Sequence, residues 1–414
     1  MKNLFHFLFF FLLVTQICFA QWYLQNSGTT KDLLGVSFTD ANIGTVVGSG
    51  GTILRTTNGG TDWTAQTSGT TYYLNAVDFI SKDYGWIAGD MSPDSGIIIR
   101  TTNGGIEWTS QTVSHNLYGI DFVDSLVGWT VGMVGTILKT TDGGVNWLPQ
   151  TSGTTNAFRD VFFVDQFVGW SVGGYFSNLI RKTTDGGLTW FEQTSSSSQS
   201  FWSIHATDDL HAWAAEVTGN VYKTTDGGSN WLLRSTGTTT SINSVFFVND
   251  QIGWAGGGNY IYESGMYKTT DAGETWNSQS VPTNNQIASV YFTDFQNGWA
   301  VAIEGVILHT SNGGVSFVEE EQFNELPTEF LLTQNYPNPF NPSTKIKYSV
   351  PQSSDVVIKV FDILGNEIET LINEEKSVGT YEITWYAANS PSGIYFFTIN
   401  AGSFVETKKM ILMK

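Results

Sequence analysis

Residues Thr140-Thr141-Asp142-Gly143-Gly144-Val145-Asn146-Trp147 form a short motif that the chain repeats seven times. The shared pattern is Thr-(Thr/Ser)-(Asn/Asp)-(Gly/Ala)-Gly-x-x-Trp, and Phe317 replaces the tryptophan in the last copy. The other copies begin at Thr56, Thr101, Thr183, Thr224, Thr269 and Thr310. Adjacent glycines permit positive φ, and the preceding Asp or Asn can accept hydrogen bonds from the backbone just beyond it. The motif therefore predicts a hairpin turn between two strands, here named the Gly-Gly turn.

The spacing of these turns predicts the fold class. From Trp63 to Phe317 the closing aromatic residue recurs after 45, 39, 43, 41, 45 and 41 residues. Before each turn lie two more strand patterns, such as Val77-Asp78-Phe79 and the start Gly128-Trp129, and a fourth strand follows the turn. Four short strands per unit, repeated about every forty residues, indicate the blades of a β-propeller. We therefore expect an all-β protein with a seven-bladed propeller over residues 21–322.

The two ends of this repeat predict how the ring closes. Residues 22–30 resemble the fourth strand of other units, such as residues 147–155, yet they stand before the first unit. The seventh unit lacks a good fourth strand, because Phe317 replaces tryptophan and three glutamates follow at residues 319–321. We expect the N-terminal strand to complete the seventh blade and to leave no exposed edge.

The chain changes character at about residue 323. Most of its nine prolines lie beyond this point, and the forty-residue period stops. Residues 323–343 are expected to form a Pro- and Asn-rich linker and motif. Alternating strand patterns over residues 344–414 predict a small Ig-like β-sandwich.

Composition and the N-terminus point to an exported protein. Residues 1–20 combine Lys2, an apolar run and small residues before Gln21, which predicts a signal peptide cleaved there. The only cysteine, Cys18, lies within it, so we expect no disulfide in the mature chain. No later segment is apolar enough to span a membrane. The net charge of −19 argues against binding nucleic acid, and no cofactor or metal motif is present.

The repeat resembles the Asp-box (BNR-like) propellers, most closely the photosystem II stability/assembly factor-like family of seven-bladed propellers, over about residues 22 to 320. Sialidases and xyloglucan hydrolases share the same turn. The C-terminal region is similar to the type A sorting domain of the type IX secretion system. The residues that carry this second resemblance are Gln334-Asn335-Tyr336-Pro337-Asn338-Pro339-Phe340-Asn341-Pro342-Ser343-Thr344, Val360-Phe361-Asp362-Ile363-Leu364-Gly365, Ser392-Gly393-Ile394-Tyr395 and Lys408-Lys409-Met410. It implies a partner in the type IX machinery, and release or attachment at the cell surface.

Three repeated residue sets are candidate sites, and each has a structural interpretation. The third residues of the turns could bind metal or act as acids, but we expect them to cap their own turns; they are Asn58, Asn103, Asp142, Asp185, Asp226, Asp271 and Asn312. The repeated tryptophans are expected to fill the space between blades. A basic residue before each turn could form a ring for an anion, but a solvent-facing strand position is the expected reason; these residues are Arg55, Arg100, Lys139, Lys182, Lys223, Lys268 and His309.

The loops predict a recognition face. Units two, four and six are enlarged between strands two and three, on the side that also holds the links between blades. These loops and links carry aromatic residues suited to sugar rings or protein surfaces. The candidate ligand face comprises Tyr72, Tyr73, Tyr118, Tyr175, Phe176, Phe201, Trp202, Tyr260 and Tyr262, with Met91 nearby. Variation in loop length without any function, with the aromatic side chains packed between blades, would give the same pattern.

No catalytic constellation is visible in the sequence. The five histidines show no metal spacing, and the five arginines do not form the cluster that a sialidase needs. The sequence therefore predicts a secreted or cell-surface, non-catalytic module that binds an extracellular protein or glycan. The alternatives are a secreted glycoside hydrolase of the sialidase or xyloglucanase type, and a purely structural surface component.

Overall fold

The computed structural model describes residues 22–92, 94–175, 177–259, 263–314, 329–335, 338–387 and 390–413. The chain divides into two compact units, Met1–Phe317 and Val318–Lys414. The signal peptide predicted at residues 1–20 lies outside the described residues. Within them, no helix is long and apolar enough to cross a membrane.

The first unit contains seven four-stranded antiparallel sheets, which are the blades of a propeller. Blade 1 consists of β2 (Leu33–Phe38), β3 (Gly44–Gly48), β4 (Thr52–Thr56) and β5 (Thr64–Thr67). Blade 2 consists of β6 (Leu74–Phe79), β7 (Gly85–Ser92), β8 (Ser95–Thr101) and β9 (Thr109–Val113). Blade 3 consists of β10 (Leu117–Phe122), β11 (Gly128–Gly132), β12 (Ile137–Thr140) and β13 (Leu148–Pro149).

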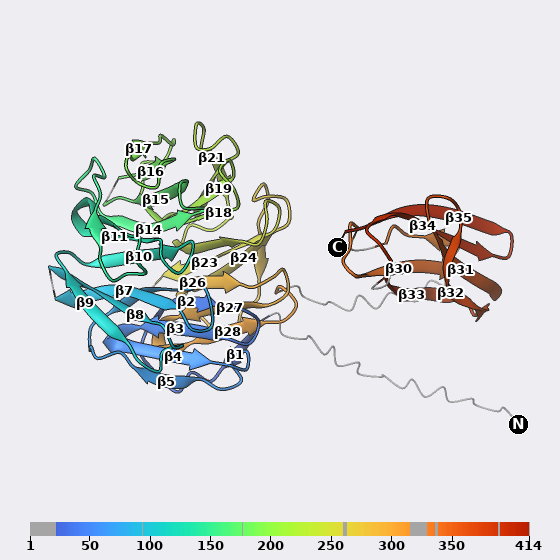
Figure 1. Ribbon diagram of the computed structural model, residues 1–414, viewed down its shortest axis with the longest axis horizontal. Coiled ribbons are helices and arrows are strands. Elements are labelled where there is room, and N and C mark those ends of the chain that lie inside the picture. Colours follow the sequence, from blue (N-terminus) through green and yellow to red (C-terminus); the bar gives the residue numbers. More distant parts are fainter. Residues whose placement is uncertain are drawn as a thin grey trace, which may run out of the picture. The chain divides into compact units, whose positions relative to one another are not determined.

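The remaining blades follow in chain order (Figure 1). Blade 4 consists of β14 (Phe158–Phe163), β15 (Gly169–Gly173), β16 (Leu179–Thr183) and β17 (Phe191–Glu192). Blade 5 consists of β18 (Phe201–Ala206), β19 (Ala212–Glu216), β20 (Asn220–Thr224) and β21 (Leu232–Ser235). Blade 6 consists of β22 (Ile242–Phe247), β23 (Gly253–Asn259), β24 (Glu263–Thr269) and β25 (Asn277–Gln279). Short 3-10 turns η1 (Ser49–Gly51), η2 (Met133–Gly135) and η3 (Ile303–Gly305) join strands two and three in blades 1, 3 and 7.

Blade 7 is completed by the N-terminal strand, as predicted. It contains β26 (Ile287–Phe292), β27 (Gly298–Ala302) and β28 (Ile307–Thr310), and β1 (Tyr23–Gln25) pairs antiparallel with β28. Figure 1 shows the blue β1 beside the orange β28. The fully buried Trp22 donates from Nε1 to Gln279 Oε1 at 2.9 Å, which anchors the strand to blade 6 as well. Strands from both ends of the propeller sequence thus close the ring.

Aromatic stacking between blades forms the repeated core. The tryptophan that starts the second strand lies face to face with a phenylalanine of the next blade, as in Trp129 and Phe163, with centroids 3.5 Å apart. The tryptophan after the Gly-Gly turn meets the same phenylalanine edge-on, as Trp190 does at 5.9 Å. This confirms that the repeated tryptophans fill the space between blades, where offset and edge-to-face pairs are favourable.

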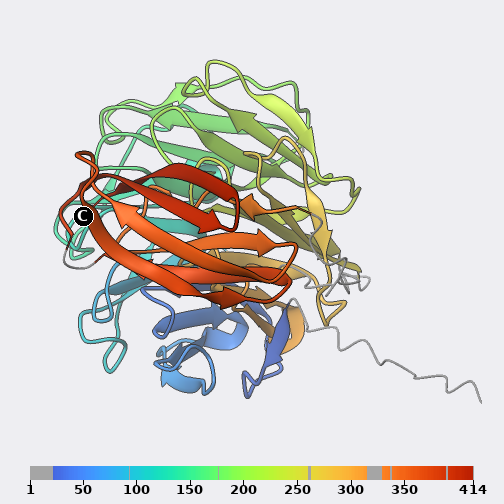
Figure 2. The ribbon, with the colours of Figure 1, turned by 90° about the vertical axis from the view of Figure 1, so that its right-hand side faces the viewer.

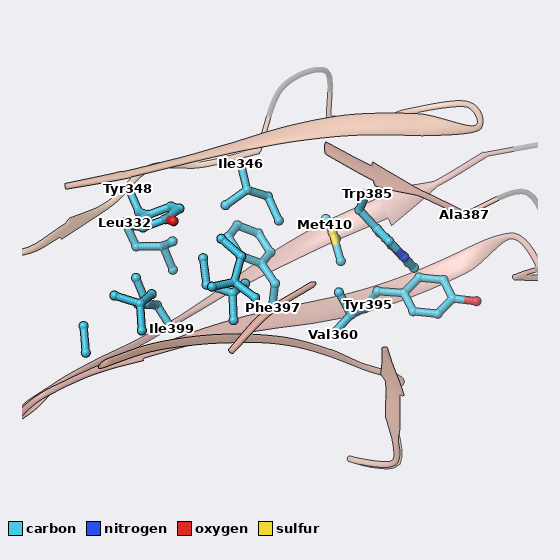
Figure 3. Close-up of a cluster of buried hydrophobic side chains, with 14 of the residues drawn as sticks. Leu332, Ile346, Tyr348, Val360, Trp385, Ala387, Tyr395, Phe397, Ile399 and Met410 are labelled. Atoms are coloured by element: carbon cyan, nitrogen blue, oxygen red, sulfur yellow. The ribbon is translucent and has the colours of Figure 1, made fainter. Parts of the chain in front are cut away.

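The second unit is a β-sandwich of two antiparallel sheets, orange to red in Figure 2. One sheet holds β29 (Leu331–Leu332), β30 (Ser343–Val350) and β33 (Gly379–Tyr386). The other holds β32 (Glu367–Lys376), β31 (Ser354–Phe361), β34 (Gly393–Ala401) and β35 (Phe404–Leu412) in that order. Figure 3 shows the shared core, where Trp385 and Tyr395 meet edge-on at 5.3 Å.

Part of the stretch expected as a linker is built into this sandwich. β29 pairs with β30, and Phe340 is 2% exposed and forms a parallel bridge with Leu412. Phe340 N donates to Ile411 O and Met413 N donates to Phe340 O, each at 3.0 Å. Hydrogen bonds and an aromatic side chain therefore tie the described motif residues to the last strand.

Candidate functional site

A β-bulge at the start of the first strand of every blade creates a ring of side chains. In each blade the pairing register shifts around one residue, for example between Phe158 and Asp160 in β14. Bulges re-aim the side chain of the extra residue. The seven bulged residues, one from each blade, all line one cavity; they are Leu34, Asn75, Tyr118, Arg159, Trp202, Asn243 and Ala288. We name this ring the channel mouth.

The cavity at the channel mouth measures about 430 Å³. Tyr73 and Gln286, from the links between blades, extend its wall. Among the described residues that line it, Asp160 is the only carboxylate. Asp160 accepts hydrogen bonds from Ile204 N and Val161 N at 2.9 Å each, so its oxygens are already used by the scaffold. Burial nevertheless raises the pKa of Asp160 to about 6.

Arg159 is held between two aromatic rings at this mouth. Its guanidinium carbon lies 4.6 Å from the centroid of Tyr118 and 4.9 Å from that of Trp202. Such cation–π contacts orient the guanidinium plane without using its N–H groups. Arg159 makes no hydrogen bond or ion pair with any residue that the structure describes. Its five N–H donors are therefore not engaged by the described residues.

Two amide side chains flank the arginine. Asn75 Nδ2 donates to Asp90 Oδ1 at 3.0 Å and to Leu117 O at 2.8 Å. Burial raises the pKa of Asp90, an effect that the Asn75 hydrogen bond and the charge of Arg159 partly offset. Asn243 Nδ2 donates to Ile287 O at 2.7 Å, but its buried Oδ1 has no hydrogen-bond partner among the described residues. A ligand N–H or a water would satisfy this oxygen.

In the first strands of the blades, buried carboxylates connect one blade to the next. Asp78 accepts from Phe122 N at 2.8 Å, and Asp121 accepts from Phe163 N at 2.7 Å. Burial raises the pKa of Asp78 to about 7 and that of Asp121 well above its usual value, the latter also because Asp78 is near. Within the described residues no group of three or more His, Cys, Asp or Glu could hold a metal ion. These carboxylates therefore serve as hydrogen-bond acceptors in the scaffold.

The structure separates the predicted ligand-face residues into three groups. Tyr73, Tyr118 and Trp202 converge on the channel mouth. Tyr72 lies outside it with Met91, in a separate surface hollow of about 540 Å³, and Tyr175 is 68% exposed without lining either cavity. Phe176, Tyr260 and Tyr262 lie outside the described residues.

Phe201 was predicted wrongly as a ligand-face residue. Its side chain is fully buried and packs edge-on against Tyr222 at 5.4 Å. The residue precedes the bulge in β18 and so points between blades, whereas the bulged Trp202 points to the mouth. Sequence adjacency alone could not show which of two neighbouring aromatics the bulge would expose.

The third residues of the Gly-Gly turns cap their own turns, as expected. Asp142 Oδ1 accepts from Thr140 Oγ1 and from Asn146 N, both at 2.9 Å, and Asn146 Nδ2 donates to Oδ2 at 2.8 Å. These bonds lower the pKa of Asp142 to about 2. Their equivalents pair in the same way with the threonine two residues earlier; they are Asn58, Asn103, Asp185, Asp226, Asp271 and Asn312.

The contacts of the basic residues before the turns fit neither sequence interpretation, the anion-binding ring or the solvent-facing strand position. Lys139 Nζ lies 4.8 Å from the centroid of Trp129 and donates to Gly186 O, in the turn of the next blade, at 2.8 Å. Lys268 does the same toward Trp254 and Gly313. Burial lowers the pKa of both lysines. Lys139 and Lys268 therefore link neighbouring blades and are neither solvent-facing nor free for an anion, whereas His309 contacts Tyr23 and Trp299 within its own blade.

The described sorting-motif residues have structural contacts. Asn335 Nδ2 donates to Thr344 Oγ1 at 2.9 Å, and Asn338 Oδ1 accepts from Ile411 N at 2.9 Å. The carbonyl of Lys409 accepts from Gln334 Nε2 at 2.7 Å. Gly393 begins β34 opposite Leu412. Pro339, Asn341 and Pro342 flank the buried Phe340, whereas Tyr336 and Pro337 lie outside the described residues.

Sequence reasoning missed Arg159, Asn75 and Asn243. A signal for them existed: each is the second residue of its first strand, the same place as Tyr118 and Trp202. Aligning the first strands of the seven blades at this position would have identified all seven residues of the channel mouth.

Comparison with known proteins defines the class. The sequence profile described as "Photosynthesis system II assembly factor YCF48" matches residues 14–119 and 109–245, together more than half of the chain. The chain therefore belongs to this YCF48 family of propellers. A second profile, the secretion system C-terminal sorting domain, matches residues 334–413. This domain indicates secretion or display at the outer surface.

Solved structures with the same fold include two YCF48 propellers. "YCF48 bound to D1 peptide" is 22% identical, with a TM-score of 0.59, covering 71% of this chain and 98% of that one. YCF48 from Cyanidioschyzon merolae is 21% identical, with a TM-score of 0.59 and coverages of 70% and 98%. PorZ, a surface component of the type-IX secretion system of Porphyromonas gingivalis, is 12% identical, with a TM-score of 0.51 and coverages of 93% and 60%. No curated protein matches the chain.

Proposed function

We propose that the protein is a non-catalytic receptor outside the cell, whose channel mouth binds a carboxylate-bearing segment of a partner protein. The observation that carries this proposal is Arg159, which two aromatic rings orient over the cavity while its donors stay unengaged. A planar guanidinium with free, fixed donors matches a carboxylate in two parallel hydrogen bonds.

The rest of the mouth supports a peptide as the ligand. Tyr73 and Trp202 are 50% and 38% exposed and offer apolar ring faces beside the arginine. Asn243 Oδ1 can accept an N–H, and peptides supply one at every residue except proline. A YCF48 propeller of the same fold has been solved with a peptide bound. A sugar could stack on the same rings, but a neutral sugar would leave the arginine charge unpaired.

The signal peptide and the sorting domain provide the route by which the receptor would leave the cell. The signal peptide predicted at residues 1–20 would direct the chain across the inner membrane and be removed before Gln21. The sorting domain would then pass the folded propeller to the type IX machinery, so that the channel mouth meets its partner outside the cell.

The alternative of a glycoside hydrolase has less support. A xyloglucanase uses a pair of carboxylic acids that flank the scissile bond, whereas a sialidase uses a tyrosine nucleophile and an arginine cluster, and Arg159 is the one arginine among the described residues that line the cavity. Among the described residues lining the cavity there is one carboxylate, Asp160, and backbone N–H groups occupy its oxygens. Release of product from aryl-glycosides or plant polysaccharides by the purified protein would overturn the receptor proposal.

Binding to peptide and glycan arrays tests the proposal directly. Full-length protein should bind synthetic peptides that end in a free carboxylate and bind matched amidated peptides at least ten-fold more weakly. R159M should lose that preference, whereas R234M, which removes an arginine paired with Glu274 at 2.9 Å, should keep it. Equal binding by R159M and wild type, or binding only to glycans, would reject the carboxylate-bearing peptide.

A further inference from the structure

Several residues that define the sorting domain by sequence have a packing role. Phe340, Val360, Tyr395 and Met410 are all at most 4% exposed and belong to one core. Their side chains are needed for the sandwich to fold. Three described apolar residues of the same motifs are exposed: Ile394 at 43%, and the adjacent Ile363 and Leu364, which are much more so.

Ile363 and Leu364 project into solvent at the tip of the hairpin between β31 and β32. Their side chains are 68% and 81% exposed, and Leu364 is the most exposed large apolar residue among the described part of the second unit. Burying an aliphatic side chain is favourable, so two adjacent exposed ones at a turn contribute nothing to folding. Polar residues normally occupy such turns.

The turn is rigid, which distinguishes it from a loose loop. Asp362 Oδ1 accepts from Leu364 N at 2.8 Å and from Asn366 N at 2.9 Å, and Asn366 Nδ2 donates to Oδ2 at 2.9 Å. The backbone adds Asp362 N to Asn366 O at 3.0 Å, and Gly365 supplies a φ of 83°. The Asp362–Asn366 pairing repeats that of Asp142 and Asn146 in the Gly-Gly turn. A preformed turn loses little entropy when it docks.

The surroundings indicate the chemistry of the partner surface. Lys359 Nζ and Glu367 Oε2 pair at 2.7 Å at the base of the hairpin, so these two flanking charges balance. Ile368, 43% exposed, is a further exposed aliphatic residue at the start of β32. The tip therefore suits an apolar pocket better than a charged groove.

We propose that Ile363 and Leu364 form the docking tip by which the sorting domain inserts into an apolar pocket of the secretion machinery. The secretion machinery is the expected partner because the tip belongs to residues 334–413, which match a secretion sorting domain. The inference is independent of the ligand at the channel mouth. It assigns recognition to a few rigid apolar atoms, while the buried motif residues maintain the fold that presents them.

An export assay of the full-length chain, in cells that carry the secretion system, tests this proposal. I363S/L364S should reduce the exported fraction at least ten-fold, with the protein retained inside the outer membrane. The matched control V405S removes another exposed aliphatic side chain of the sandwich, 61% exposed on β35, and should be exported normally. I363V/L364M keeps the tip apolar and should also be exported.

Thermal unfolding of the purified variants separates docking from folding. The unfolding temperature of I363S/L364S should match that of wild type, because the tip is not in the core. Normal export of I363S/L364S would overturn the proposal. So would a lowered unfolding temperature that accounts for the lost export, since the tip would then serve the fold of the sandwich itself.

Discussion

The guanidinium of Arg55 lies 4.4 Å from the centroid of Phe79 and takes the place of a tryptophan at the first blade interface. At five other interfaces a tryptophan stacks on the equivalent phenylalanine, as Trp86 does on Phe122 at 3.6 Å. In blade 1 the tryptophan position holds Thr45, whose Oγ1 accepts from Arg55 Nη1 at 2.6 Å. A threonine and an arginine together replace one indole ring.

R55A should therefore lower the free energy of unfolding by about 2 kcal/mol, because it uncovers the Phe79 ring and removes the partner of Thr45. The double variant T45W/R55K recreates the tryptophan and lysine of blade 3 and should be at least as stable as wild type. Urea unfolding followed by tryptophan fluorescence measures both. A cost below about 0.3 kcal/mol for R55A would show that the contact is not needed.

Removing Trp22 should loosen the closing strand. W22A deletes a fully buried side chain that bonds Gln279 and meets Phe292 edge-on at 5.7 Å, so we expect a loss of about 3–5 kcal/mol. W22F keeps the aromatic packing and should lose less. Hydrogen exchange should rise in β28 before it rises in the other blades. Uniform exchange across all seven blades would contradict the role of β1 in closing the ring.

Asp78 should make stability depend on pH. Its pKa is raised from 3.8 to about 7, so the folded chain keeps a proton that the unfolded chain has lost. Its contribution is therefore fully present below pH 3.8 and is lost as the pH rises to 7. D78N cannot ionise, and its amide oxygen can still accept from Phe122 N. Relative to wild type, D78N should gain about 4 kcal/mol between pH 4 and pH 8.

The comparison with D78N at each pH cancels the opposing effect of buried His205, whose pKa is lowered to about 3 by burial. D355N, at an exposed position of β31, serves as a control and should show a flat difference. Urea unfolding at a series of pH values measures both variants. A D78N difference that stays flat as well would mean that Asp78 is ionised in the folded protein throughout.

Two neighbouring aromatics should respond oppositely to truncation. F201A removes a fully buried ring and should cost about 3–5 kcal/mol of stability, while leaving Arg159 between its two rings. W202A removes a ring that is 38% exposed and should cost about 1 kcal/mol, but it should weaken ligand binding because Arg159 loses one support. Thermal melts and peptide binding distinguish the two. Equal melting temperatures would place Phe201 outside the core.

The repeat made the propeller predictable. Glycine pairs, the tryptophan period and the strand-like residues 22–30 depend on local turn chemistry and periodicity, and the structure confirms the ring and its closure. Strand β32 was not predicted, because the run Glu367–Lys376 is charged and mostly exposed on an edge of its sheet. Its assignment depends on pairing with β31, which a local pattern does not encode.

The candidate site was predicted only in part. Tyr73, Tyr118 and Trp202 were predicted because they are aromatic residues in or near loops. Arg159 was not predicted, because its place in the site depends on cation–π contacts with Tyr118 and Trp202, which lie in other blades. The lysines before the turns were misread for the same reason. Lys139 has its partners in another strand and in the next blade, and a single repeat does not show them.

The pairing of β1 with β28 sets an order of events in biosynthesis. The earliest-made strand of the ring finds its partner at residues 307–310, which emerge last. Until then β1 lacks its partner strand, and the ring cannot close. The propeller of a nascent chain is therefore open until β28 has been synthesised, and the pairing of β28 with β1 then closes it.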